Sequence, residues 1–599
     1  MTKEESMNGH SLEYGLIGNC SIATLIDPHG SIVWGCFPQF DGDPTFCALL
    51  SPAHAGHGSW SIELEDFDRA EQAYERNTAV LVTRLFDRKG QGVEITDFAP
   101  RFRQRGRIYH PVMLMRRVRP ISGRPRVQIR LRPLDGLGAS IPSTTSGSNH
   151  IRYLLGAQTM RLTSDLPVPF IRRELPFILD RGFHFIWGPD ETPDDAPAQL
   201  LEHHLAQTLD YWHQWTRYLS VPFEWQEAVI RAAVTLKLCQ FESTGAIIAA
   251  PTTSIPEAPD SGRNWDYRYC WLRDAAFVVR ALNRLGATRS MEEYLGFMLN
   301  LISANGELNP VYGVTFEDQL EEHQAEALSG FSGMGPVRIG NLAWEQRQYD
   351  IYGSLILAAE QIFFDQRLRR VGDRDVFDKL EQLGEQAWAN AEQPDAGLWE
   401  YRGGKHVHTY TAAMAWVGCD RLARIAGVLG DDAREQHWRG RADCLRESIL
   451  AWAYDAELGH LVAHKGGRHL DASLLPLAEL GFIAYDDPRF MATVDAIGRD
   501  LREGDYIFRY RHQDDFGTPQ TSFTLCTFWY IGALAGMGRK DEARRLFENI
   551  LDHRTRLGLL SEDIDPKTGA LWGNFPQTYS MVGLINAAMR LSRSWEEAL

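Results

Sequence analysis

The sequence lacks three features that mark large classes of proteins. Its 8 cysteines include no C-x-x-C pair, so the pattern favours unpaired thiols in a reducing compartment over a disulfide framework or a zinc site. The first 15 residues contain no apolar signal-peptide core, and no apolar run reaches the length of a membrane span. We therefore expect a cytoplasmic protein that does not associate with membranes.

Positive charge is also scarce. The chain has 62 Lys and Arg residues against 79 Asp and Glu residues, which gives a formal net charge of -17 at pH 7. Nucleic-acid binding depends on Lys and Arg that neutralise phosphates, so no nucleic-acid partner is predicted. The sequence leaves the oligomeric state open.

The amino-terminal third of the chain is predicted to be β-structure. Segments 80–86, 93–98 and 127–132 alternate apolar and polar residues, and turn signals such as 27–30 and 41–44 lie between such segments. We interpret residues 1–198 as an antiparallel β-sandwich. A segment rich in Pro and Asp, 189–197, ends it, and residues 199–222 are predicted to form a linker helix.

From residue 223 onward the apolar period changes from 2 to 3.6, and twelve helical stretches can be counted. With a length of 599 residues, a second domain is expected. Six helical hairpins closing on themselves predict an (α/α)6 toroid, the catalytic barrel, for residues 223–599. An open solenoid is the alternative, but no repeat of fixed period supports it.

The joints between these helices alternate between very short and long. Short joints make neighbouring helices antiparallel, so all the long joints should lie at one end of the toroid. The aromatic and charged motifs occur in long joints: NWDYRYCWLRD (264–274), GPVRIGN (335–341), GLWEYR (397–402), LLSEDID (559–565) and GNFPQ (573–577). Since loops of such length are uncommon unless functional, we expect a binding site there.

Two glutamates in these joints, Glu400 and Glu562, are candidate catalytic residues. One protonated and one ionised carboxyl group are what glycosidic bond cleavage requires. Sugars also need aromatic faces for their CH surfaces and planar polar groups for their hydroxyls. The same joints supply both kinds of side chain, among them Tyr267, Trp271, Arg273, Asp274, Arg338, Trp399, Arg402, Asn574 and Gln577. By contrast, Trp416 and Trp529 lie within helices and are expected to pack in the core.

These motifs, together with FTLCTFW (523–529) and the opening segments 14–19 and 30–34, resemble glycoside hydrolase family 15, the glucoamylase and bacterial trehalase family. The resemblance runs nearly end to end. It implies an inverting, exo-acting α-glucoside hydrolase that needs no metal or other cofactor. Glu400 matches the general acid of that family and Glu562 its general base.

The resemblance also implies roles for the binding residues. Tyr267 matches a tyrosine near the catalytic water, Arg273 and Asp274 match the pair that grips the terminal glucose, and Trp271 matches an aromatic wall. Trp399, Arg402, Arg338 and the loop from Asn574 to Gln577 are expected to line the pocket.

Departures from the family pattern leave the substrate open. Thr411-Ala412 replaces a serine-lysine pair, 578–581 reads TYSM, and the segment 316–323 is unusual. The first interpretation is a glucoamylase-type enzyme that releases β-glucose from short α-glucans or oligosaccharides. The alternative is an α,α-trehalase. A glycan-binding or phosphorolytic relative is a third, which Glu562 disfavours because a carboxylate would repel phosphate.

Overall fold

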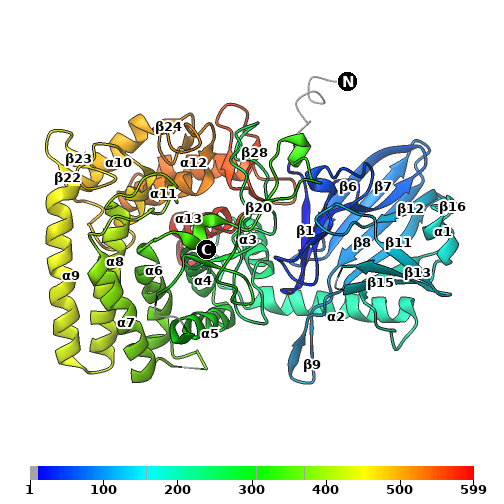
Figure 1. The fold of residues 1–599 in the computed structure, drawn as a ribbon, viewed down its shortest axis with the longest axis horizontal. Coiled ribbons are helices and arrows are strands. Elements are labelled where there is room, and N and C mark those ends of the chain that lie inside the picture. Colours follow the sequence, from blue (N-terminus) through cyan, green and yellow to red (C-terminus); the bar gives the residue numbers. More distant parts are fainter. Residues whose placement is uncertain (1–10, 157, 305–306, 370, 599) are drawn as a thin grey trace.

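The computed structural model describes residues 11–156, 158–304, 307–369 and 371–598. An antiparallel β-domain is followed by a helical domain, and helix α2 (Pro197–Arg217) lies below the β-domain and reaches the helical domain at one end (Figure 1). The sequence-based fold class is confirmed. The last long strand of the β-domain, β17 (Phe183–Pro189), ends shortly before α2, and the first helix of the toroid is α3 (Gln226–Leu238).

Two antiparallel sheets form the β-domain. The first has the order β1-β2-β3-β5-β12-β16, with β4 paired to β3, and comprises β1 (Gly15–Gly18), β2 (Ala23–Ile26), β3 (Ile32–Cys36), β4 (Pro44–Phe46), β5 (Ser59–Leu64), β12 (Arg126–Arg132) and β16 (Phe177–Ile178). The second has the order β13-β14-β15-β17-β11-β8-β7-β6 and comprises β13 (Ser143–Ser146), β14 (His150–Leu155), β15 (Gln158–Ser164), β17, β11 (Leu114–Ser122), β8 (Gly92–Phe98), β7 (Leu81–Asp87) and β6 (Phe67–Tyr74).

The alternation of buried and partly exposed side chains along the strands explains how the two sheets pack. In β12 the side chains of Val127, Ile129 and Leu131 are buried while the residues between them are partly exposed. Because successive side chains of a strand point to opposite faces, one face of each sheet contributes to a shared apolar core. The other face of the eight-stranded sheet is partly covered by Leu201 and Leu205 of α2.

The helical domain is an (α/α)6 toroid. Its inner ring closes on itself, because each member contacts the next in the order α4, α6, α8, η5, α11, α13 and back to α4. The inner elements are α4 (Leu272–Arg284), α6 (Asp350–Ala359), α8 (Thr409–Val428), η5 (Ala472–Leu477), α11 (Thr524–Gly536) and α13 (Thr578–Leu591). The outer helices are α3, α5 (Thr288–Ala304), α7 (Arg374–Asn390), α9 (Asp432–Ala453), α10 (Pro488–Asp500) and α12 (Lys540–Asp552).

One of the twelve predicted helices differs from the prediction. The eighth, expected to be α-helical from near Asp471, is the short 3₁₀-helix η5. Pro476 lies inside it, and proline lacks the N–H that an α-helix interior requires. Apolar periodicity therefore located the element correctly but did not specify its helix type.

Small strand pairs brace the long joints. Strand β18 (Cys270–Trp271) pairs with β19 (Val311–Tyr312), and β26 (Ser522–Phe523), β27 (Asp563–Ile564) and β28 (Leu571–Trp572) form a three-stranded sheet. These pairings connect joints that are far apart in the sequence. Among the described residues, no helix is both long enough and apolar enough to span a membrane.

Candidate active site

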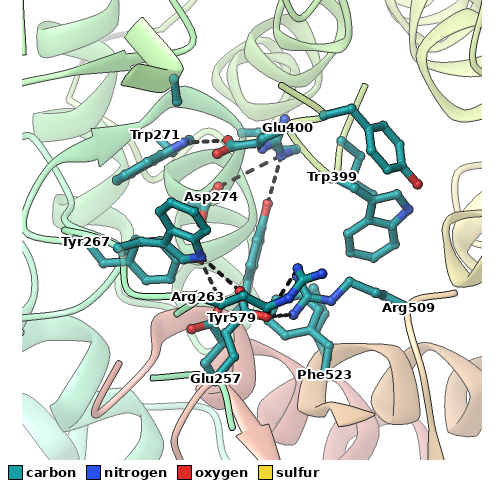
Figure 2. Close-up of a pocket in the computed structure, with 18 of the residues that line it drawn as sticks. Glu257, Arg263, Tyr267, Trp271, Asp274, Trp399, Glu400, Arg509, Phe523 and Tyr579 are labelled. Carbon is teal, nitrogen blue, oxygen red and sulfur yellow. Dashed lines mark hydrogen bonds and ion pairs between the residues drawn. The ribbon is translucent and has the colours of Figure 1, made fainter. Parts of the chain in front are cut away.

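A cavity lies at the long-joint end of the toroid and encloses about 930 Å³, part of which is open to solvent. All the long joints except the one before η5 contribute to its wall. Nine of the eleven residues predicted for the site line it: Tyr267, Trp271, Arg273, Asp274, Trp399, Glu400, Arg402, Glu562 and Gln577. Figure 2 shows Glu400 and Trp271 on one side of this cavity, with Glu257, Arg263 and Arg509 on the opposite side.

The Glu400 carboxyl group is held through one of its two oxygens. Trp271 Nε1 donates to Glu400 Oε1 at 2.7 Å, and Arg273 Nη2 and Gln348 Nε2 donate to the same oxygen at 3.2 Å each. No described residue donates a hydrogen bond to Oε2. The Glu400 backbone has a φ of 59°, a left-handed conformation that is unfavourable for a residue with a side chain, and Gln346 Nε2 donates to its carbonyl oxygen.

Glu562 is buried, with 2% of its surface exposed, and lies directly before strand β27. Its backbone N–H donates to the carbonyl oxygen of Asn574 at 3.2 Å, and its carbonyl accepts from the N–H of Thr524 at 2.9 Å. Tyr267 Oη donates to Glu562 Oε1 at 2.7 Å. The segments on both sides of the carboxyl group are therefore fixed by the joints before α11 and α13.

Two aromatic rings lie between the two glutamates. Tyr267, which binds Glu562, and Trp271, which binds Glu400, meet edge to face with ring centroids 5.4 Å apart. The two carboxyl groups are thus connected by one continuous chain of contacts along the cavity wall. Since both residues come from the joint before α4, this joint contacts both candidate catalytic groups.

Burial controls the protonation of Glu562. Loss of solvent, and then the neighbouring Glu257 carboxylate, raise the pKa of Glu562 to about 8, while Arg509 and the Tyr267 hydroxyl act in the opposite direction. A higher pKa makes the Glu562 carboxylate a stronger base, and it also reduces the fraction that is ionised at neutral pH.

Arg273 and Asp274 lie in the first turn of α4 and are both buried. Arg273 is fully engaged, since it contacts Gln348, Asp350, Tyr579 and Glu400. Asp274 Oδ2 is buried and lies 3.9 Å from Arg273 Nε, but it has no hydrogen-bond partner among the described residues. Because buried polar atoms are nearly always paired, this oxygen is a ready acceptor for a ligand hydroxyl. Burial raises the pKa of Asp274 to about 7, which Arg273 opposes.

The remaining predicted residues within the cavity wall are anchored differently. Trp399 Nε1 donates to Asp471 Oδ2 at 3.1 Å, so the side chain that contacts the Glu400 carboxyl group is Trp271 rather than Trp399. Gln577 caps α13, where its side chain accepts from Ser580 N–H.

Two predicted lining residues, Arg338 and Asn574, do not line the cavity. Asn574 is fully buried and braces two joints, since its side chain accepts from Thr252 and donates to the carbonyl of Trp265 at 2.8 Å. Arg338 pairs with Glu322. Planar polar side chains form hydrogen bonds and ion pairs within loops as readily as they bind sugar hydroxyls. The residue types alone therefore did not show that Arg338 and Asn574 lie outside the cavity wall.

Sequence reasoning missed the acidic and basic groups opposite Glu400. Glu257, Arg263 and Arg509 line the cavity, where Glu257 accepts from Arg509 Nη2 and, at 3.0 Å, from Trp265 Nε1. Arg509 comes from the long joint between α10 and α11, which lies at the cavity end of the toroid. Its place in this joint could have marked it as a candidate lining residue. Trp529, expected in the core, also lines the cavity.

Comparison with known proteins places the chain among carbohydrate-active enzymes. The family model described as "Glycosyl hydrolases family 15" matches residues 225–589, and the model "Trehalase-like, N-terminal" matches residues 8–165.

The chain is similar to proteins named trehalase. It is 31% identical to one from Thermoplasma volcanium, covering 98% of this chain and 93% of that protein, and 32% identical to one from Mycolicibacterium smegmatis, covering 98% and 92%. Among solved structures, a bacterial glucoamylase complexed with acarbose superposes with a TM-score of 0.68 and 14% identity, covering 97% of this chain and 94% of that one. At this identity the likeness concerns the fold alone.

Proposed function

This chain belongs to glycosyl hydrolase family 15, and we propose that it is an α,α-trehalase that cleaves trehalose with inversion. The sequence motifs placed a glucoamylase-type activity first. The trehalase names of relatives that match over nearly the whole chain favour the alternative. The observation that carries the proposal is the shared cavity, in which Glu400 and Glu562 are linked through Trp271 and Tyr267.

In the proposed reaction, Glu400 is the general acid. Its Oε1 accepts three hydrogen bonds, which leaves Oε2 to carry the proton that passes to the glycosidic oxygen. Glu562 is the general base. It takes a proton from a water molecule that attacks the anomeric carbon on the opposite face of the sugar ring. Asp274, whose Oδ2 faces Arg273 but has no hydrogen-bond donor among the described residues, would accept a hydroxyl of the glucose at the bottom of the pocket.

The stereochemistry of the products tests the inverting mechanism. Trehalose contains two α-linked anomeric carbons, so inversion at one of them yields one β-glucose and one α-glucose in each turnover. Retention would yield two molecules of α-glucose. NMR of freshly formed product distinguishes these results, and an initial product that is entirely α would contradict the proposed mechanism.

The substrate is tested with trehalose, maltose, isomaltose and maltotriose assayed side by side. We expect the highest kcat/KM on trehalose. A preference for maltotriose over trehalose would favour the glucoamylase-type activity instead. Glu400→Gln and Glu562→Gln should each lower kcat on the preferred substrate by several orders of magnitude, since each removes one of the two required groups.

The individual roles are separated with α-glucosyl fluoride. Fluoride leaves without protonation, so Glu400→Gln should retain most of its hydrolysis of this substrate, whereas Glu562→Gln should not. The reverse pattern would exchange the two assignments.

We propose the cytoplasm as the compartment, because all 8 cysteines are free and free thiols suit a reducing environment.

A further inference from the structure

Exposure of the wall residues shows which end of the cavity receives the leaving group. Arg273, Asp274 and Glu562 at the floor expose 3%, 6% and 2% of their surface. By contrast, Asp515 of the cavity wall is exposed, and its neighbour Phe516 and Trp265, whose rings are in contact, are only partly buried. These residues therefore lie toward the mouth. A disaccharide whose first ring is bound by Arg273 and Asp274 therefore directs its second ring, the leaving group, toward this mouth.

One carboxylate connects Arg402, which lines the cavity, with Arg338, which does not. Glu322 Oε2 lies 2.7 Å from Arg402 Nη2, and Glu322 Oε1 lies 3.1 Å from Arg338 Nε. The side chain of Glu322 is 11% exposed, that of Arg338 is 15% exposed and that of Arg402 is 27% exposed. Such partly buried charges are less screened by solvent than surface ion pairs.

Backbone hydrogen bonds hold the same segment from the other side. Asp515 Oδ2 accepts from the N–H of Arg402 at 2.8 Å and from the N–H of Gly403 at 2.9 Å. We name Glu322, Arg338, Arg402 and Asp515 the rim clamp. Its members come from three joints, those before α6, α8 and α11, so the clamp ties together loops that are far apart in the sequence.

The clamp also stacks on the aromatic residues of the mouth. The Arg402 guanidinium lies 4.7 Å from the ring centroid of Trp265 and 5.4 Å from that of Phe516, and the Arg338 guanidinium lies 5.0 Å from the ring centroid of Trp265. Two cations thus contact the Trp265 indole. Glu322 belongs to the segment 316–323, which departs from the family pattern.

We propose that Glu322 is a positioning residue that determines specificity. It does not line the cavity, but it holds Arg402, which does, on the leaving-group side and so restricts the leaving group to a single glucose. This inference rests on the proposed trehalase function. It explains why a fold shared with a glucoamylase can favour a disaccharide, since a longer leaving group would have to pass between Arg402 and the opposite wall.

The test compares two substrates with the same scissile bond. One is trehalose, and the other is a trisaccharide in which one glucose of trehalose carries a further α-1,4-linked glucose. For Glu322→Gln we expect the ratio of kcat/KM for the trisaccharide to that for trehalose to rise roughly tenfold, the lower end of what single pocket contacts discriminate. Asp515→Asn should raise the same ratio. Glu322→Asp, which keeps the carboxylate, should raise it less than Glu322→Gln does.

The matched control is Glu321→Gln, the same chemical change one residue earlier. Glu321 is exposed, and its carboxylate has no ion pair among the described residues. If Glu322→Gln and Asp515→Asn give the same ratio as Glu321→Gln while their melting temperatures show folded protein, the rim clamp does not set specificity. If the wild-type enzyme fails to cleave trehalose at all, the proposed function itself is wrong, whatever the ratio shows.

Discussion

At the scale of single residues, the properties of Glu562 are set by four groups around it. Glu257 adds negative charge, Arg509 adds positive charge, and the Tyr267 hydroxyl and the Asn574 N–H each donate a hydrogen bond. Arg509 is shared, because its Nη2 contacts Glu257 and lies 3.9 Å from Asp563 Oδ1. Removing a negative charge should therefore lower the pKa of Glu562, and removing a positive charge or a hydrogen-bond donor should raise it.

Glu257→Gln should move the acidic limb of the kcat/KM profile to lower pH. The limb reports the pKa of the base in the free enzyme, and that pKa is raised by Glu257. The substitution removes this negative charge and frees Arg509, and both changes favour the ionised form of Glu562. Rates measured with trehalose between pH 4 and 9 check the shift.

The control is Asp471→Asn, which alters the carboxylate that holds Trp399 and should leave the acidic limb in place. An unmoved limb in Glu257→Gln would contradict the electrostatic effect of Glu257 on Glu562.

Tyr267→Phe should shift the same limb in the opposite direction. The hydroxyl of Tyr267 lowers the pKa of Glu562 through its hydrogen bond, so its loss leaves the base easier to protonate. Hydrogen bonds to charged groups contribute about 1.5–3 kcal/mol, and we expect kcat/KM at neutral pH to fall at least roughly tenfold. A shift to lower pH in this variant would show that the hydroxyl does not act on Glu562.

Residue types in long joints were a good guide to part of the site. Tyr267, Trp271, Glu400 and Glu562 could be predicted to meet in one cavity because their motifs stand out by their aromatic content and their place in the helix order. Glu257 was missed because a lone carboxylate among 79 acidic residues has no distinguishing pattern. Its importance comes from burial beside another carboxylate, which only the folded chain reveals.

At the scale of elements, the loop 573–577 depends on its first residue. Gly573 has a φ of 76°, and a Cβ built there would lie 2.6 Å from Glu562 Cβ and 2.7 Å from Glu562 Oε2. Gly573→Ala should therefore displace the candidate base and lower kcat more than roughly tenfold, since a displacement of about 1 Å at a reacting group can cost 10²-fold.

Backbone strain alone must be separated from this displacement. Gly538 has a similar φ of 85°, but no atom lies within 4 Å of a Cβ built there. Gly538→Ala should therefore cost stability through strain of about 1–3 kcal/mol while kcat stays near the wild-type value. Equal loss of kcat in both variants would show that general strain, and not contact with Glu562, is responsible.

The order of the helices could be predicted from apolar periodicity because the inner and outer helices bury different faces. Inner helices such as α8 bury nearly every residue, whereas outer helices such as α12 bury only one face. The predicted strands at 80–86, 93–98 and 127–132 correspond to β7, β8 and β12. The pairing of β26 with β27 was not predictable, since two-residue strands have no periodicity.

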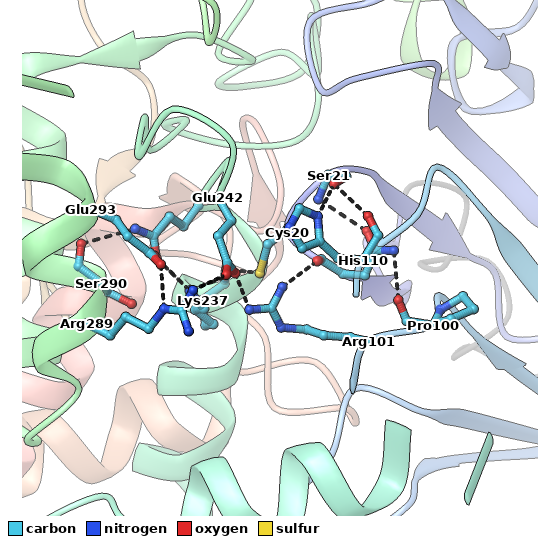
Figure 3. A network of polar contacts seen from close by, with 12 residues as sticks. Cys20, Ser21, Pro100, Arg101, His110, Lys237, Glu242, Arg289, Ser290 and Glu293 are labelled. Carbon is cyan, nitrogen blue, oxygen red and sulfur yellow. Dashed lines mark hydrogen bonds and ion pairs between the residues drawn. The ribbon is translucent and has the colours of Figure 1, made fainter. Parts of the chain in front are cut away.

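At the scale of the whole molecule, a buried ionic network joins the two domains (Figure 3). Arg101 follows strand β8 in the β-domain and is 1% exposed, and its Nη2 contacts Glu242 Oε2. Glu242 follows α3 in the helical domain and also contacts Arg289 Nη2 at 2.9 Å and Lys237 Nζ at 3.5 Å. Glu293 shares two of these cations, Lys237 at 3.4 Å and Arg289 at 2.6 Å, whereas Glu242 is the only ion-pair partner of Arg101 among the described residues.

Glu242→Gln should weaken the attachment of the β-domain to the toroid. The substitution leaves Arg101 buried without its counter-charge, which typically costs about 3–5 kcal/mol. Burial opposes ionisation, but Arg101 and Lys237 lower the pKa of Glu242 from 4.5 to about 2. The stability that this group contributes is therefore complete above pH 4.5 and is lost as the pH falls toward 2.

Urea unfolding at several pH values checks both the size and the pH dependence of this loss. The difference in unfolding free energy between wild type and variant should be constant above about pH 5 and shrink below it. Glu65→Gln, which removes an exposed pair with Arg126, should cost at most about 1 kcal/mol. If Glu242→Gln costs no more than this surface control, the network does not hold the domains together.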